Sequence, residues 1–164
     1  MSEADIVAAI RSAIRSGDTA KVLELIGQKN GRIDVMTPFG TWLHIASKAG
    51  RLELVQALVQ MGADVNRKGG TFGGSALNLA AGYGQVEIAE FLIDHGANLH
   101  VAEPEQNPLF SAIQGGHLAI VKLLIEKGID HTIAYTGDSM KGMAAIDFAI
   151  ERGQTEIATF LSCL

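Results

Sequence analysis

Cysteine is nearly absent from this 164-residue sequence, because Cys163 is the only one. A single cysteine cannot form an internal disulfide, and Cys163 has no cysteine or histidine beside it at metal-ligand spacing. A secretory start is also lacking, since the first residues are acidic where a signal peptide needs basic residues and an apolar stretch. We therefore expect a cytoplasmic protein.

Long apolar runs and clusters of basic residues are lacking as well. Lys or Glu interrupts the apolar stretches, and none approaches the roughly 20 residues that cross a bilayer. The net charge is −5 and the basic residues are scattered, whereas affinity for a phosphate backbone needs clustered Lys and Arg. These absences argue against a membrane protein and against a nucleic-acid partner.

What the sequence does contain is enough apolar material for a core. Apolar residues make up 48% of the chain and charged residues 19%, which predicts one folded domain over residues 1–164. Charge is unevenly distributed, since residues 1–82 carry 9 basic and 7 acidic side chains and residues 83–164 carry 4 and 11. The acidic half favours a basic partner.

Glycines recur at fixed spacing along the chain. One series has intervals of 32 to 37 residues, at Gly17, Gly50, Gly84, Gly116 and Gly153. A second glycine follows 12 residues later in three of the units, at Gly62, Gly96 and Gly128. Such a period is the signature of a repeat architecture whose units stack on their neighbours.

Each unit predicts two antiparallel helices and a loop. Between the two glycines an apolar helical face recurs, in the second unit at Leu52, Val55, Leu58 and Val59. A shorter alanine-rich helix precedes the first glycine, as at residues 43–47 and 77–81. The second glycine can end its helix in the left-handed conformation, after which the chain turns into a loop.

These units resemble the ankyrin repeat. The second unit carries Thr41-Trp42-Leu43-His44 and closes with residues 61–66, Met-Gly-Ala-Asp-Val-Asn, close to the Thr-Pro-Leu-His and Gly-Ala-Asp-Val-Asn of the family pattern. The resemblance covers almost the whole chain. It implies an all-α ankyrin-repeat solenoid of about five helix-turn-helix repeats with projecting loops. It also implies that His44 and His117 form hydrogen bonds within the fold.

The predicted units are residues 4–35, 36–68, 69–100, 101–133 and 134–164. The first is expected to be an amino-terminal cap, because Arg11, Arg15 and Lys21 would lie on its outer, water-facing side. The last ends directly after its second helix and is expected to be the other cap. A Ser, Thr or Asn at the start of an inner helix can cap it by accepting a backbone N–H.

The loops and the inner helices are the expected binding surface. In a solenoid, inserted residues map to loops along one face, and the loops at 67–74 and 133–143 are unusual. Aromatic and Met side chains among polar ones are typical of an interface. The predicted partner-binding residues are Phe39, Trp42, Lys48, Phe72, Tyr83, Glu103, Glu105, Phe110, Gln114, Tyr135, Asp138, Met140, Lys141 and Glu151.

Aromatic side chains are the strongest candidates for binding hot spots. Among the predicted binding residues these candidates are Trp42, Phe72, Tyr83 and Tyr135. The alternative for Trp42 and Phe110 is that they pack inside the fold, since large aromatics are mostly buried on average.

Catalytic and cofactor signals are weak. The glycine-rich segment 69–75 lacks the Gly-Lys-Ser/Thr ending of a phosphate-binding loop, and no strand precedes it. His95, His100 and His131 lie beside Asp94 or Asp130 or near the closing turns but lack metal-ligand spacing. No nucleophile and base can be paired. We expect no enzyme, cofactor or metal. A deep pocket that brings together Glu103, His131, Tyr135 and Asp138 would instead favour an enzyme.

The function expected from this pattern is protein binding. The loops are similar to those of small stand-alone bacterial ankyrin proteins, some of which resemble immunity proteins that neutralise a toxin. An acidic, monomeric inhibitor would suit a basic toxin such as a nuclease. The alternative is a regulatory subunit or scaffold that binds a cellular enzyme, and a designed repeat protein is disfavoured by the irregular loops.

Overall fold

The computed structural model describes the whole chain except residues 1, 28–31, 71–72, 100–105 and 135–141. Within the described part the chain forms helices, and no strand is assigned there. The helices are α1 (Glu3–Ser16), α2 (Thr19–Gly27), α3 (Trp42–Lys48), α4 (Leu52–Gln60), α5 (Ala76–Gly82), α6 (Val86–Asp94), α7 (Pro108–Gly115), α8 (Leu118–Glu126), α9 (Ala145–Glu151) and α10 (Thr155–Leu161). None of these described helices has the length and apolarity needed to span a membrane.

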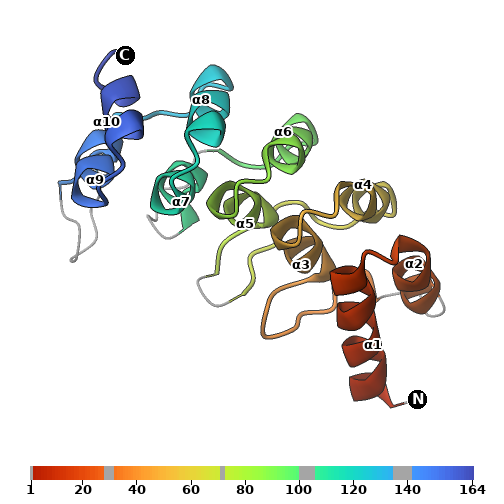
Figure 1. Cartoon of the computed structure of the whole chain (residues 1–164). Coiled ribbons are helices and arrows are strands. Elements are labelled where there is room, and N and C mark those ends of the chain that lie inside the picture. Colours follow the sequence, from red (N-terminus) through yellow and green to blue (C-terminus); the bar gives the residue numbers. More distant parts are fainter. Residues whose placement is uncertain (1, 28–31, 71–72, 100–105, 135–141) are drawn as a thin grey trace.

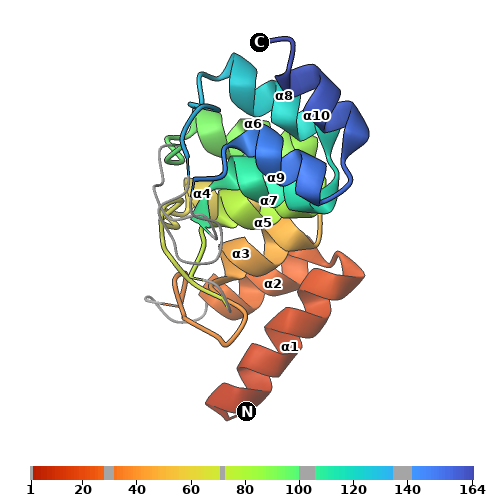
Figure 2. The ribbon, with the colours of Figure 1, turned by 90° about the vertical axis from the view of Figure 1, so that its left-hand side faces the viewer.

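The helices stack as successive antiparallel pairs in an arched array (Figure 1). Odd-numbered helices lie on the inner side, toward which the loops project, and even-numbered helices lie on the outer side. Figure 2 views the array from the inner side, where α9, α7, α5, α3 and α1 follow one another. The all-α solenoid is confirmed, and the predicted unit boundaries remain a proposal.

The first glycine series occupies the junction between the two helices of each pair. All five glycines have a φ between 69° and 78°, the left-handed region that favours glycine. The residue that follows each later glycine packs with its side chain against the equivalent glycine of the preceding unit. An added Cβ at Gly50 would lie 2.7 Å from Oε1 of Gln85, and one at Gly116 would lie 2.9 Å from Oε1 of Gln154. The spacing therefore reflects both helix reversal and unit-to-unit packing.

Arg51 attaches the amino-terminal cap to the second unit. Its Nε donates a hydrogen bond to the carbonyl of Ile14 at 3.0 Å, and its Nη2 donates to the carbonyl of Arg15. Both carbonyls belong to the last turn of α1, where a helix has unpaired acceptors and a partial negative charge. A cation is favourable at that position.

The core lies between the inner and outer helices. In α4 the buried residues are Leu54, Val55 and Leu58. Most buried side chains of the first three units form one cluster, which Leu123 joins, and most of those of the last two units form another, which Ala81 joins; Ile93 and Leu99 pack against both. Val55 and Leu58 of the predicted face are buried, whereas Leu52 and Val59 are only half-buried and Leu54, which was not predicted, is buried beside them.

Helix starts follow the expected capping chemistry in part. Asn107 Oδ1 accepts the backbone N–H of Leu109 at 2.9 Å, and Pro108 occupies the first turn, where its missing N–H costs nothing. At Thr41 the backbone N–H instead donates to Nδ1 of His44, three residues later. This hydrogen bond from the Thr41 backbone to the His44 ring closes the first turn of α3, because His44 lies three residues further along the helix.

Candidate functional site

A groove of about 760 Å³ runs along the inner side of the first four units. Its walls come from α1, from the turn at 37–40, from Gly69, Gly70 and Gly74, and from the inner helices, mainly their carboxyl ends. The lining residues are Arg11, Arg15, Phe39, Ile45, Lys48, Ala49, Gly69, Gly70, Gly74, Asn78, Leu79, Gly82, Tyr83, Ser111, Gln114 and Gly115. This set is called the inner groove below.

Phe39 stands at the tip of a tight turn. Thr37 and Gly40 exchange backbone hydrogen bonds of 3.0 Å, and the Thr37 hydroxyl accepts the N–H of Phe39 at 3.1 Å. Gly40 has a φ of 93°, so a residue with a side chain would strain this turn. The Phe39 side chain is 49% exposed, and the guanidinium of Arg11 lies 4.2 Å from its ring centroid.

His44 joins the two turns that wall the inner groove. Its Nδ1 accepts the Thr41 N–H at 3.2 Å, so Nε2 carries the proton and donates to the Gly74 carbonyl at 3.1 Å. A Cβ on Gly40 would lie 2.6 Å from Cγ of the same ring. Burial lowers the pKa of His44 below 6.5, although the hydrogen bond to Gly74 opposes that shift. The ring is therefore a neutral structural link, as the family resemblance implied.

Tyr83 ends α5 beside the groove floor. Gly84, with a φ of 76°, reverses the chain directly after it, and the Tyr83 side chain stays 49% exposed. Nζ of Lys48, the last residue of α3, lies 4.7 Å from the Tyr83 ring centroid. A second pairing of cation and aromatic ring therefore forms between neighbouring units.

The inner groove is cationic. Arg11, Arg15 and Lys48 line it, and no Asp or Glu is among its described lining residues. Its other polar groups are hydroxyls and amides, which donate and accept hydrogen bonds. The arrangement offers cations, exposed rings and hydrogen-bond donors along one open surface. Such a surface can contact a ligand through charge, ring stacking and hydrogen bonds.

Four predicted binding residues, Phe39, Lys48, Tyr83 and Gln114, line the inner groove. Glu151 is exposed at the end of α9 and does not belong to its lining. Phe72, Glu103, Glu105, Tyr135, Asp138, Met140 and Lys141 lie outside the described residues.

Trp42 and Phe110 require a correction, because both side chains are buried. Trp42 is 1% exposed, and its Nε1 donates to the carbonyl of Arg32 at 2.9 Å. Phe110 is 5% exposed, and its ring centroid lies 5.2 Å from that of Phe148. Each follows the start of an inner helix and turns into the stack. They shape the fold beneath the loops and do not line the inner groove.

Arg11 and Arg15 differ in part from expectation. Both are accessible to water, with Arg15 exposed and Arg11 half-buried, but they line the inner groove and do not lie on the outer side. They are four residues apart on α1 and so lie on one helical face. That spacing was the available signal, but only the position of α1 in the stack shows which way the face points.

Metal-binding clusters are absent from the part of the chain that the structure describes. No three His, Cys, Asp or Glu side chains gather there closely enough to hold an ion. His95 Nδ1 instead pairs with the Phe91 carbonyl at 2.8 Å, and the two rings stack with centroids 3.9 Å apart. His117 Nε2 pairs with the Gly82 carbonyl at 3.1 Å, which confirms its hydrogen-bonding role within the fold.

Comparison with known proteins identifies the repeat. The sequence profile of ankyrin repeats in three copies matches residues 9–103 and 99–164. The chain belongs to the ankyrin-repeat family. Solenoids of this kind present extended concave surfaces that bind other proteins, so the chain is a protein-interaction module.

Individual relatives share the repeats over parts of their length. A palmitoyltransferase of the yeast Lachancea kluyveri is 31% identical over 87% of this chain and 20% of its own length. A putative ankyrin repeat protein of Rickettsia felis is 37% identical, over 54% and 40%. Mouse protein phosphatase 1 regulatory subunit 27 is 36% identical, over 56% and 60%. The chain thus spans a fifth to three fifths of the length of these relatives. The transferase activity in the name of the first belongs to that longer protein.

Proposed function

We propose that this protein is a non-enzymatic binding module that holds one protein partner in the inner groove. The observation that carries the proposal is the pair of half-exposed aromatic rings, Phe39 and Tyr83, each stacked with a cation of a neighbouring element. Large amphipathic rings beside Arg supply much of the binding energy in protein interfaces. Glu151 and the predicted loop residues outside the described part of the chain stay candidates for contact with the partner, whereas the buried Trp42 and Phe110 do not.

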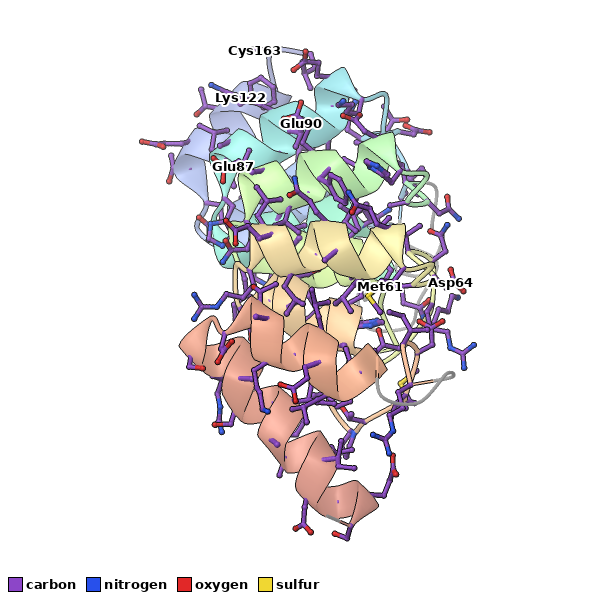
Figure 3. All side chains as sticks on the ribbon, turned by 90° about the vertical axis from the view of Figure 1, so that its right-hand side faces the viewer. Met61, Asp64, Glu87, Glu90, Lys122 and Cys163 are labelled. Atoms are coloured by element: carbon purple, nitrogen blue, oxygen red, sulfur yellow. The ribbon has the colours of Figure 1, made fainter. Side chains whose placement is uncertain are left out.

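The test is capture of partners by the tagged chain from a lysate of its source, with binding then measured on the purified partner. Replacing both Phe39 and Tyr83 with Ala should weaken binding by roughly a thousandfold, because hot-spot truncations cost about 2 kcal/mol or more each. Met61→Ala is the matched control, since Met61 is 47% exposed on the outer side of the array (Figure 3). Equal affinity of the double variant and wild type would contradict the proposal.

Two kinds of partner remain candidates. A regulatory role is supported by the phosphatase regulatory subunit among the relatives, because that protein is named as a regulator. Neutralisation of a basic toxin or nuclease is supported by the net charge of −5, since opposite charge speeds encounter. A one-to-one complex that abolishes the partner's activity supports an immunity role, and a complex that leaves it active supports a scaffold.

The proposed free state is a cytoplasmic monomer. Size-exclusion chromatography with light scattering should give the mass of one chain, 17.3 kDa. A stable dimer would show that the inner groove or the outer face is already occupied by a second copy.

A further inference from the structure

The cations of the inner groove indicate the charge of its occupant. Arg11, Arg15 and Lys48 all face the groove. None of the three forms an ion pair with a carboxylate among the described residues, where ion pairs occur elsewhere, at Lys21, Arg32 and Lys127. Three cations without a carboxylate among the described lining residues favour a positive site, because a cleft concentrates the field of its lining charges.

Stacking on aromatic rings prepares two of these cations for a ligand. The guanidinium of Arg11 lies over the face of Phe39, and Nζ of Lys48 lies over the face of Tyr83. A guanidinium that is stacked on one face keeps its N–H edge free, and that edge matches the two oxygens of a carboxylate. The rings therefore restrict the cations without consuming their hydrogen-bonding capacity.

Apolar side chains line the groove together with the cations. Ile45 and Leu79 line the groove beside the two exposed rings. A bare anion would leave this surface in contact with water, whereas a peptide that carries an apolar side chain between acidic ones would cover it. The lining thus fits a mixed acidic and apolar segment better than a free phosphate or a basic segment.

The charge of the groove is opposite to that of the whole chain. The net charge is −5, but Glu87 and Glu90 lie on the outer side of the array, away from the inner groove (Figure 3). Outer-side Lys127 contacts Asp94 at 2.6 Å. The net charge of the chain favours a basic partner, whereas the positive field of the groove favours an acidic segment.

We infer that the inner groove binds an extended segment of the partner protein in which Asp or Glu residues flank a large apolar side chain. The carboxylates bind Arg11, Arg15 and Lys48, and the apolar side chain packs between Phe39 and Tyr83. This inference rests on the proposed function, since it assigns the chemistry of the segment held in the same groove.

The test selects random peptides on the immobilised full chain by display and compares three proteins. Wild type should enrich peptides with net negative charge and a Leu, Ile or Phe. The Arg11→Glu and Lys48→Glu double variant should lose them, with the affinity of a chosen acidic peptide falling roughly tenfold or more. Lys122→Glu is the control, because it makes the same kind of charge change on the outer helix α8 (Figure 3) and should keep wild-type affinity.

Salt gives a second readout. Affinity of the acidic peptide should fall as ionic strength rises, since screening at 0.15 M acts over about 8 Å. Basic or neutral peptides whose binding is lost in the Phe39→Ala and Tyr83→Ala variant would overturn the acidic occupant and leave groove binding intact. If neither variant changed which peptides are enriched, both proposals would be overturned.

Discussion

Substitution of Gly115 by Ala tests the packing that builds the groove floor. A Cβ at Gly115 would lie 2.5 Å from the backbone oxygen of Gly82 and 2.6 Å from Nε2 of His117. The backbone oxygen belongs to α5 and cannot rotate away, so α7 must shift. The same Cβ would also displace the His117 ring from its hydrogen bond to Gly82.

The magnitude follows from three contributions. Overpacking costs about 1–3 kcal/mol, loss of one hydrogen bond costs about 1 kcal/mol, and Ala in place of a helical Gly returns up to about 1 kcal/mol. The net expectation is a loss of about 2 kcal/mol of unfolding free energy, which lowers Tm by about 4–8 °C for a chain of this size.

Urea unfolding followed by circular dichroism measures the effect, with two glycines of the same chain as controls. Gly27 also ends a helix, but nothing lies within 4 Å of its added Cβ, so Gly27→Ala should be neutral or slightly stabilising. Gly82→Ala should be tolerated, because its nearest contact is 3.6 Å. If Gly115→Ala were as stable as Gly27→Ala, the close approach of α5 and α7 would be refuted.

Three further predictions concern the core and the link between the turns. Leu58→Ala should cost about 2–5 kcal/mol in urea unfolding, because Leu58 is fully buried and leaves a cavity; a cost below 1 kcal/mol would contradict its core position. Trp42→Phe should cost about 2–4 kcal/mol, because it removes the bond to the Arg32 carbonyl and leaves a cavity at a fully buried site; unchanged stability would contradict this buried position. His44 has a lowered folded pKa, so the unfolded state binds the proton first as pH falls. The contribution of His44 to the free energy of unfolding should be fully present above about pH 6.5 and decrease below it. His44→Asn, which copies Asn78 of the next unit, should reduce this decrease of stability at low pH.

The repeat could be predicted from local sequence alone. Glycines at the helix junctions are required by left-handed backbone, so their spacing could be seen without a structure. The apolar period of residues 51–59 likewise predicted Val55 and Leu58 of the buried face of α4. These features depend on a residue and its near neighbours, which is why they can be predicted.

The lining of the inner groove could be predicted only in part. Phe39, Lys48, Tyr83 and Gln114, which were predicted for the concave face, do line the groove, because repeat geometry puts loop tips and inner helix ends on one side. The burial of Trp42 depends on the carbonyl of Arg32, ten residues away in a loop, and no periodicity encodes that contact.

The sign of the groove charge also could not be predicted from composition. Net charge sums over every surface, whereas the groove collects three cations from α1 and α3 and excludes the acidic outer helices. Which side chains share one surface is decided by the stacking of units, and that arrangement brings α1 beside the turn at 37–40 through the contact between Arg11 and Phe39.

Amide hydrogen exchange on the complex with the captured partner tests the central claim most directly. If the partner occupies the inner groove, protection should increase in the turn at 37–40, at Lys48 and Tyr83, and around Gln114, while α4 and α6 on the outer side stay unchanged. Protection confined to the outer helices, with the inner turns exchanging as in the free protein, would contradict the account.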